Sequence, residues 1–467
     1  MKKFLKGFVL FLIILVSGYF AYTYFQNKAS YIGVIHENAN SALKIAIHDI
    51  KETLILDALT SPRYYYNDEE SAEQKQGNGI EIGHNVFCYS LAEIPNTYFT
   101  TLNISDTNAF QIFIENKLAK KNIFIQEAEK EEYQFAFLNT MKMAVAWNDK
   151  KIVLAVSLRP TDEKLTEVFT DILVKDKTIK ESEHSLLQAL KGESSHIIYS
   201  NGHDVATIDF TDNEAKLNGK IFSNTIVTSL TKSEVAFIPN TSLSFQLDSN
   251  FKRFFVKDNW LEKLDKTTFF SKSNIEASKI AAHTTGFLSF EIRGKTIQKD
   301  TIITYDYDEN FEKVEQKSIQ ENEVPKMVLK LGAEKQNLRQ YFIEAKAIDE
   351  NNVFIPLPFY KWYVSENDSC TSFSTFKEEV ETKQRSSYAI FDANVNFEKL
   401  QQDVGLNQTR QLFKLLDNLN IEMFHFDKNQ FNIAGGLKGK NPEINILSQL
   451  YFGLEIVKDS TQREAEL

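Results

Sequence analysis

A glycine-rich segment near the C-terminus, GGLKGK at residues 435–440, has the residue types of a phosphate-binding loop. A phosphate-binding loop needs glycines whose backbone N–H groups surround the phosphates, and a lysine followed by serine or threonine. Here Ala434 stands where the first glycine is required, and Asn441 follows Lys440. The spacing therefore excludes this loop and favours a glycine-rich turn with its lysines in solvent.

A second string, DYDEN at residues 306–310, has the alternating acidic residues that begin a calcium-binding loop. Such a loop needs glycine at its sixth position for a sharp turn and a bidentate glutamate at its twelfth. The sequence has Phe311 and Lys317 at those positions. We therefore expect the end of a β-strand, and only Asp306 and Asp308 are candidates for carboxylate-based hydrolysis.

Histidine, serine and cysteine patterns specify no further reaction. The eight histidines include no H-E-x-x-H pair, and no G-x-S-x-G string marks a nucleophile elbow. The two cysteines, Cys88 and Cys370, leave both a disulfide and free thiols open, because sequence spacing does not fix the distance between their Cα atoms. The sequence therefore predicts no catalytic residue, no metal ligand and no cofactor.

One aromatic cluster is a candidate binding patch. Tyr64, Tyr65 and Tyr66 are consecutive and precede an acidic stretch at residues 68–70. Tyrosine rings are common at interfaces because they combine apolar area with a hydroxyl group. The pattern favours a strand edge half packed on the core, and a patch that binds a sugar or a peptide is the alternative.

The N-terminal segment has the composition of a membrane anchor. An uncharged run, GFVLFLIILVSGYFAYTYF, extends from Gly7 to Phe25, and at about 1.5 Å per residue it spans roughly 28 Å, close to the hydrocarbon thickness of a bilayer. Lys2, Lys3 and Lys6 precede it, which favours a cytoplasmic N-terminus. A cleaved signal peptide is the alternative, although the run is long and no A-x-A site follows it. Both interpretations export the bulk of the chain.

Composition limits the classes of partner. The 467 residues include 53 basic and 64 acidic side chains, a formal net charge of −11. Such a surface repels phosphate backbones, which argues against nucleic acid as a partner. Hydrophobic residues make up 42% of the chain, so a sizeable core can be buried, and the length is enough for two or three domains of about 150 residues each.

Two orders of predicted secondary-structure elements recur along the chain. Four stretches show a strand, a small polar cap and then a helix, and the predicted caps are Asp49, Asp106, Asp248 and Asn396. Two of these stretches open with Ile-Pro-Asn-Thr, at residues 94–97 and 238–241. The other order, helix, strand, turn and strand, is predicted at 183–210 and again at 409–433. These repeated orders predict two related domains.

The predicted fold class is α+β. Short turns between strands require antiparallel pairing, because a parallel pair needs a long crossover. We expect an N-terminal transmembrane helix and two related domains of antiparallel sheets with helices packed on one face. The predicted segments are the cytoplasmic tip and anchor at 1–27, the domains at 31–228 and 235–458, and a polar tail at 459–467.

Three finer predictions concern the second domain. Strands at 287–292 and 301–307 are expected to pair as a hairpin. The charge-rich residues 309–323 are expected to form either a helix or the tip of a long hairpin. The last helix is expected to begin at Pro442 with Asn441 as its cap.

Two stretches, IPNTYFTTLNISDTNAFQIF and IPNTSLSFQLDSNFKRFF, together with the N-terminal anchor, resemble uncharacterised envelope proteins of the Bacteroidetes. Those proteins have repeated α+β regions behind an anchor or a lipidated N-terminus. This chain lacks the lipidation cysteine that many of them have. The resemblance implies an envelope protein and brings no catalytic residue with it.

The expected function is that of a non-catalytic envelope protein. It would cross the membrane once, with its N-terminus in the cytoplasm, and bind or scaffold through an exported body that is periplasmic in a Gram-negative cell. Its expected partners are the lipid bilayer and an unknown envelope protein or polymer. Two alternatives stay open: a membrane-tethered hydrolase that acts on envelope polymers, and a carrier of apolar ligands.

Overall fold

The chain divides into two compact units, Met1–Thr211 and Asp212–Leu467. The computed structural model describes residues 22–62, 77–121, 123–128, 132–138, 142–157, 162–181, 183–223, 233–237, 241–248, 260–307, 311–333, 337–357, 359–367, 370–378, 383–387, 389–405, 410–427 and 429–453. The predicted boundary, between residues 228 and 235, falls later in the sequence. The difference comes from β11 (Glu214–Phe222), which pairs with β21 (Gln430–Gly439) of the second unit.

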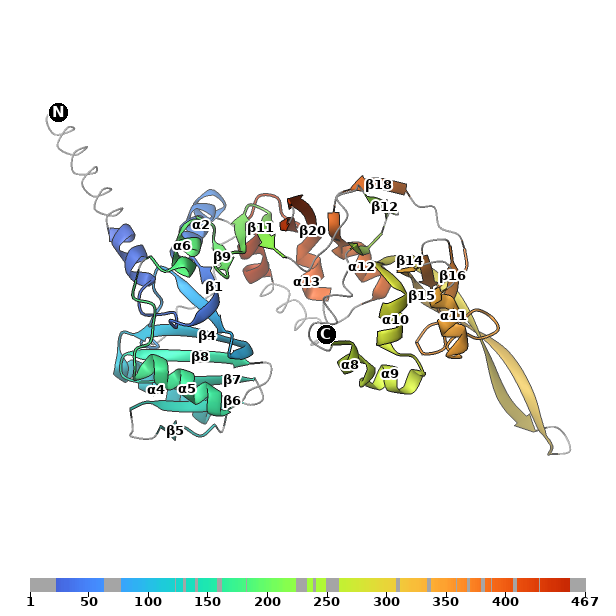
Figure 1. Ribbon diagram of the computed structural model, residues 1–467, viewed down its shortest axis with the longest axis horizontal. Helices are drawn as coiled ribbons and strands as arrows, with labels where there is room; N and C mark the ends of the chain where they lie inside the picture. The colour runs from blue at the N-terminus through green and yellow to red at the C-terminus, as the bar shows by residue number, and fades with distance from the viewer. Residues whose placement is uncertain are drawn as a thin grey trace, which may run out of the picture. The chain divides into compact units, whose positions relative to one another are not determined.

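The first unit is built on one antiparallel sheet (Figure 1). Its strands lie side by side in the order β10 (Val205–Thr211), β9 (Ile197–Ser200), β1 (Ala39–Ile45), β3 (Val86–Leu91), β4 (Ile94–Ile104), β8 (Lys151–Ser157), β7 (Met143–Trp147), β6 (Gln134–Leu138) and β5 (Gln126–Glu127). The short β2 (Ile80–Glu81) pairs with the end of β4. The predicted strands at 143–147 and 197–200 are confirmed to the residue.

Helices cover both faces of this sheet. Ala146 and Val153 belong to the core cluster under α5 (Asp162–Leu173) and α6 (Ser185–Lys191). Their sequence neighbours Trp147 and Ile152 point the other way and pack against α4 (Thr107–Ala119). The predicted packing on one face is therefore wrong for this unit. β7 and β8 are apolar at nearly every position, as strands covered on both faces are.

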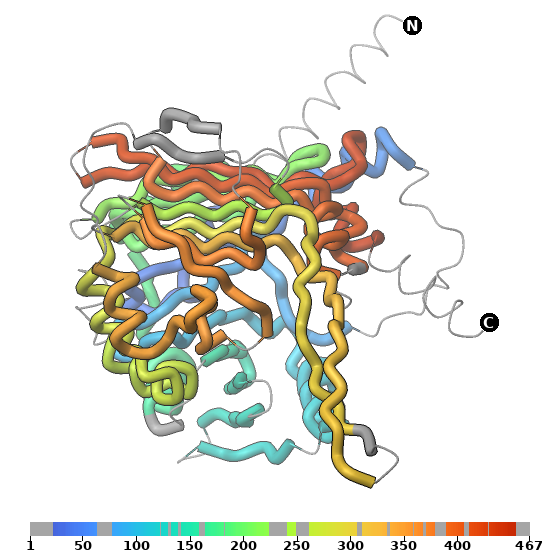
Figure 2. Tube along the Cα trace, turned by 90° about the vertical axis from the view of Figure 1, so that its right-hand side faces the viewer, coloured from blue at the N-terminus to red at the C-terminus, as the bar shows by residue number. Residues whose placement is uncertain are grey.

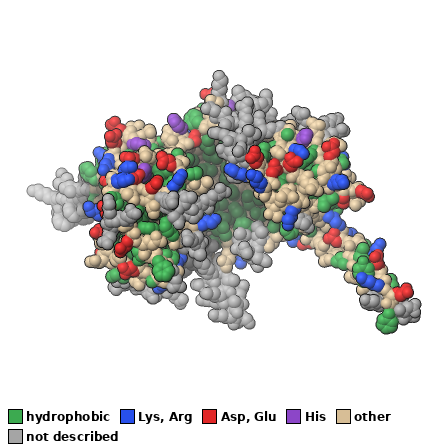
Figure 3. Space-filling view, turned by 60° about the horizontal axis from the view of Figure 1, so that its bottom comes forward, with side chains coloured by type: hydrophobic (Ala, Val, Ile, Leu, Met, Phe, Trp, Pro, Cys, Tyr) green, Lys and Arg blue, Asp and Glu red, His purple; other side chains and the backbone are tan. Residues whose placement is uncertain are grey.

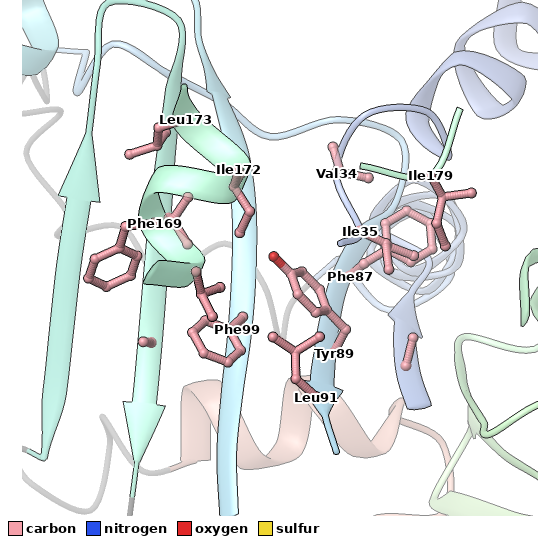
Figure 4. Packing of buried hydrophobic residues seen from close by; sticks show 14 of the residues in the cluster. Val34, Ile35, Phe87, Tyr89, Leu91, Phe99, Phe169, Ile172, Leu173 and Ile179 are labelled. Carbon is pink, nitrogen blue, oxygen red and sulfur yellow. The ribbon is translucent and has the colours of Figure 1, made fainter. Parts of the chain in front are cut away.

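The larger of these two clusters is rich in aromatic rings. Tyr89 of β3 and Phe99 of β4 stack with their ring centroids 5.9 Å apart. Phe169 and Ile172 of α5 belong to the same cluster (Figure 4). All four side chains are at most 1% exposed, and burial of each contributes about 1.5–3 kcal/mol relative to an exposed position.

A helix over residues 22–30 precedes the sheet and is attached to it through one asparagine. Asn85 lies in the loop between β2 and β3 and is 7% exposed. Its side-chain amide donates to Asn27 Oδ1 at 2.7 Å and to Ser30 Oγ at 2.8 Å. A second helix, α2 (Ile47–Thr60), follows β1 directly. The N-terminal helix is therefore held to this unit by side-chain hydrogen bonds.

The second unit is also built on one antiparallel sheet. From one edge to the other, its strands are β11, β21, β20 (Leu416–Asp427), β19 (Ala389–Asn396), β13 (Leu243–Asp248), β14 (Thr284–Tyr307), β15 (Lys313–Ala333), β17 (Cys370–Ser374) and β16 (Tyr363–Glu366). A separate pair consists of β12 (Ser233–Phe237) and β18 (Lys383–Ser387). The coarse prediction, antiparallel sheet with helices in an α+β chain, is confirmed.

The helices of the second unit are short. They include α8 (Trp260–Asp265), α9 (Thr268–Ser273), α10 (Ala277–His283), α11 (Asn337–Glu344), α12 (Phe397–Val404) and α13 (Arg410–Leu415). Phe342 of α11 meets Phe354 and Phe373 in a cluster of edge-to-face rings, with centroids 5.1–5.7 Å apart. This cluster packs α11 against one face of the sheet.

Two of the four predicted caps are confirmed. Asp106 and Asn396 each accept a hydrogen bond from the backbone N–H three residues later, at 3.0 Å and 2.9 Å, and begin α4 and α12. Asp49 is not a cap, because α2 begins before it, at Ile47. The helix predicted after Asp248 lies outside the described residues.

The last helix begins later than predicted, at residues 446–453. Asn441 forms a turn instead, in which its Oδ1 accepts from the N–H of Glu443 at 3.1 Å. Asn445 takes the capping position, since its Oδ1 accepts from the N–H of Leu447 at 3.0 Å. An asparagine precedes both candidate starts, and the capping side chain is the buried one, Asn445, which is 0% exposed.

The order helix, strand, turn and strand occurs in both units. In the first unit it is α6, β9 and β10, and in the second it is α13, β20 and β21. The flanking strands differ: β9 pairs with β1 near the start of its unit, whereas β20 pairs with β19 and β21 also pairs with β11. A relation between the two units therefore stays a prediction.

Candidate functional site

The residues predicted to enter the membrane or to form an aromatic patch lie mostly outside the described part of the chain. Those outside are Gly7, Lys2, Lys3, Lys6, Tyr64, Tyr65 and Tyr66. Phe25 is described; it lies in the helix of residues 22–30 and is 67% exposed. Within the ranges described above, no helix combines the length and the hydropathy needed to cross a bilayer.

The glycine-rich string at 435–440 is part of a strand and not the predicted turn. Gly435 of β21 pairs with Ile421 of β20 and with Leu217 of β11. A Cβ atom at Gly435 would collide with the backbone oxygen of Asn420. The glycines therefore allow neighbouring backbones to approach closely.

The acidic candidates for hydrolysis lie far along β14. Asp306 is opposite Val314 of β15, and Asp308 lies outside the described residues. At this point β14 pairs with β15 alone among the described strands. Asp306 therefore belongs to a two-stranded ribbon, which gives a substrate no enclosing wall.

This ribbon is the candidate site. β14 and β15 continue together beyond their neighbours (Figures 1 and 2), since β13 pairs with β14 only as far as Ile292 and β17 pairs with β15 only from Val328. We call residues 295–307 and 313–325 the arm. At about 3.3 Å per residue the arm is roughly 40 Å long. Its end turn includes Phe311, which is 86% exposed.

Hydrogen bonds fix the root of the arm to the body of its unit. Gln298 is 6% exposed, and its Nε2 donates to the carbonyl oxygens of Lys361 and Thr375, both at 2.8 Å. Its Oε1 accepts from the N–H of Lys361 at 2.9 Å. The ammonium group of Lys361 is 2.8 Å from Asp300, which lowers the pKa of that carboxyl group. One face of the arm is thus bound to the body at its root.

Where the arm leaves the sheet, the chain is buried and polar. Gly294 has a φ of 67° and donates its N–H to Asp403 of α12 at 2.8 Å. Burial raises the pKa of the Glu291 carboxyl group, against the opposing effect of nearby cations. The guanidinium group of Arg293 lies 5.1 Å from the ring centroid of Phe376. These contacts immobilise the exit point, so the arm has a fixed base.

Successive residues of a strand point to opposite faces, so the arm has two faces. The inner face contains Gln298, Asp300 and Val324, and it packs on the body at the root. We call the other face the outer face. From root to tip it holds Lys295 and then the cross-strand pairs Ile297–Glu323, Lys299–Glu321, Thr301–Ile319, Ile303–Lys317 and Tyr305–Glu315. At the tip, the ammonium group of Lys313 lies 3.9 Å from the ring centroid of Tyr305.

The outer face exposes large apolar side chains. The exposed fractions are 58% at Ile297, 47% at Ile303, 53% at Tyr305 and 70% at Ile319. An isolated two-stranded hairpin is at best marginally stable in water, because it has no layer to bury its apolar side chains. Exposed apolar side chains gathered on one face are a feature of interaction surfaces.

Charged residues alternate with these apolar side chains (Figure 3). Lys295 is 2.8 Å from Glu323, and Lys299 is 2.7 Å from Glu321. Such exposed ion pairs contribute about 0–1 kcal/mol each. They keep the arm soluble and give its outer face a defined charge pattern.

A cavity in the first unit bears on the predicted alternative of an apolar carrier. It has a volume of about 520 Å³ and lies between α5 and strands β5 and β6. Its lining includes Glu127, Glu132, Glu167 and Lys175 as well as aromatic rings. Pockets for apolar ligands are lined mainly by hydrophobic side chains, so this cavity does not favour that alternative.

A smaller hollow of about 240 Å³ contains a histidine pair that was not predicted. The rings of His48 and His84 lie 4.3 Å apart, beside Tyr22 and Gln26 of the N-terminal helix. Burial lowers the pKa of His84, and the neighbouring His48 lowers it further. Among the described residues, no three His, Cys, Asp or Glu side chains are placed to hold a metal ion.

Neither Cys88 of the first unit nor Cys370 of the second forms a disulfide. Comparison of the chain with protein-family models, with curated proteins and with solved structures finds no match.

Proposed function

We propose that this chain is a non-catalytic binding or scaffolding protein of the cell envelope, and that the arm is its binding element. The exposed outer face of the arm is the observation that carries the proposal. Four large apolar side chains there are 47–70% exposed on an element that extends beyond its sheet. A fixed root and a projecting apolar face are what a protein needs to reach a partner without ordering a flexible segment first.

The proposal includes the predicted anchor at Gly7–Phe25, with the cytoplasmic N-terminus favoured by Lys2, Lys3 and Lys6. A phosphatase that is active only outside the cytoplasm, fused after Leu467, tests this placement. We expect an active fusion in the membrane fraction. An inactive fusion, together with an active cytoplasmic reporter at the same position, would overturn the envelope part of the proposal.

Photo-crosslinking in intact cells tests the binding role of the arm. A photoreactive amino acid replaces Ile303 or Ile319 on the outer face, and Ile112 on α4 serves as the control. Ile112 is 53% exposed, so it is as accessible as the arm positions. We expect covalent adducts of discrete mass from both arm positions and not from Ile112. Equal yields at all three positions, or none at the arm, would contradict the proposal.

A further inference from the structure

We propose that the partner of the arm is the arm of a second copy of this chain, packed outer face to outer face with the strands antiparallel. This inference rests on the proposed binding role of the arm and names its partner. The evidence is the order of residues on the outer face, which under a two-fold rotation brings Glu323 opposite Lys317 and places no like charges opposite each other.

The two-fold axis passes midway between two cross-strand pairs, Lys299–Glu321 and Thr301–Ile319. A rotation about an axis perpendicular to the strands, in the plane between the two faces, stacks β14 on β14 and β15 on β15. It brings the pair Ile297–Glu323 of one arm over the pair Ile303–Lys317 of the other. Each contact occurs twice, as in any isologous interface.

This arrangement matches one pair of opposite charges and one pair of apolar side chains, while at the centre Lys299 faces Thr301 and Glu321 faces Ile319. Glu323 of one copy faces Lys317 of the other, and Ile297 faces Ile303. At the ends Lys295 lies opposite Tyr305, whose ring already has the ammonium group of Lys313 from its own arm 3.9 Å from its centroid. No two like charges of the six outer-face rows lie directly opposite each other, so the face has no built-in repulsion against its own copy.

The neighbouring register places like charges opposite each other. If the axis passed through the Thr301–Ile319 pair instead, Glu323 would face Glu315 of the second copy. Like charges directly opposite each other are unfavourable. The charge order therefore selects one register and makes residue-level predictions.

The contact area sets the strength of this association. A face about 40 Å long and about 10 Å wide buries roughly 400 Å² on each copy, about 800 Å² in total, which is below the 1,200–2,000 Å² of a stable interface. We therefore expect weak association of the free protein. Two copies held in one membrane have a much higher effective concentration, which favours the pair there.

Cysteine crosslinking between two separately purified variants tests the register. In a full-length background with Cys88→Ser and Cys370→Ser, one preparation carries Ile297→Cys and the other Ile303→Cys. We expect disulfide-linked dimers when the two are mixed in shared liposomes under mild oxidation, and at least fivefold fewer from either variant alone. Within one chain the two positions are roughly 20 Å apart, so they cannot bridge intramolecularly.

The matched control is Ile302→Cys, which points to the inner face and is 39% exposed. Its mixture with Ile297→Cys is expected to give no more dimer than a single variant. Equal yields from the inner-face and outer-face mixtures would overturn the proposed packing. So would the absence of dimer from the Ile297→Cys and Ile303→Cys mixture.

Charge reversal gives a second readout that does not need cysteine. Lys317→Glu and Glu323→Lys each place like charges together twice in the dimer, and each should weaken association of otherwise unmodified protein in liposomes about tenfold. The double variant restores both pairs and should return association to within about twofold of the unmodified protein. A double variant that is as weak as the singles would overturn the assigned register.

The failure of this inference is distinguishable from failure of the proposed function. Photo-adducts from Ile303 or Ile319 with the mass of a different protein, without cysteine dimers, would leave the binding role intact and refute the second copy as partner. The absence of both adducts and dimers would refute the two proposals together.

Discussion

Replacement of Gln298 by alanine should release the root of the arm. The side chain makes three hydrogen bonds, two to the carbonyl oxygens of Lys361 and Thr375 and one from the N–H of Lys361. Each contributes about 1 kcal/mol net, and the carbonyl oxygen of Thr375, a residue that is 0% exposed, loses this donor. We therefore expect Gln298→Ala to lower the local free energy of opening by about 3 kcal/mol.

Hydrogen exchange measured by mass spectrometry resolves this local change in the full-length protein. A loss of about 3 kcal/mol corresponds to exchange that is roughly a hundredfold faster in the peptide covering residues 359–367. The control is Gln316→Ala, an exposed glutamine further out on the same inner face, which should change stability by less than about 0.5 kcal/mol. A change of less than threefold for Gln298→Ala would refute the view that this side chain fixes the arm.

Three further outcomes are expected. Phe99→Ala in the first unit, at 0% exposed, should cost about 3–5 kcal/mol in urea unfolding, whereas Phe124→Ala, at 85% exposed, should cost less than about 0.5 kcal/mol. Asn396→Ala removes the cap of α12 and should cost about 1 kcal/mol, with Asn396→Asp retaining most of it. Burial lowers the pKa of His36 below its usual 6.5, so the unfolded chain binds a proton at His36 more readily than the folded chain does. The contribution of His36 to the free energy of unfolding is therefore complete above about pH 6.5, and it falls as the pH drops from there toward the pKa of the folded state. His36→Gln should flatten this part of the unfolding free energy against pH, and an unchanged slope would contradict the assignment.

Local signals in the sequence predicted several elements well. Residues 143–147 and 197–200 form strands at the predicted bounds, because their apolar runs are flanked by turn residues on both sides. Asp106 and Asn396 begin helices as predicted, because a cap depends on contacts within four residues. These features require no knowledge of distant parts of the chain.

Long-range pairing was harder to predict, and the arm shows why. The predicted hairpin between 287–292 and 301–307 is wrong, since both segments belong to the single strand β14 and both pair with β15. Gly294, which lies between the two segments, has a φ of 67° within this continuous strand. Of the two alternatives for residues 309–323, the hairpin is confirmed for 313–323 and the helix is wrong. Which strand a segment selects as its neighbour depends on the whole sheet.

The sequence alone also does not predict which apolar side chains of the arm are exposed to solvent. Alternation along β14 and β15 shows that Ile297, Ile303 and Ile319 share a face, but not whether another layer covers that face. The histidine pair was missed for a related reason, because His48 and His84 meet only through the packing of the loop after β2 on α2. Both candidate features arise from tertiary arrangement, and no short motif encodes either.

The attachment of the N-terminal helix has a mechanical consequence. Asn85 connects the sheet to Asn27 and Ser30 by two side-chain hydrogen bonds. A force on the preceding chain is therefore transmitted to the first unit through these hydrogen bonds and not through a flexible linker. If the chain before residue 22 is embedded in a bilayer, the tilt of that segment would set the orientation of the first unit relative to the membrane. Asn85→Ala would weaken this coupling, so the unit would stay attached but take a wider range of orientations.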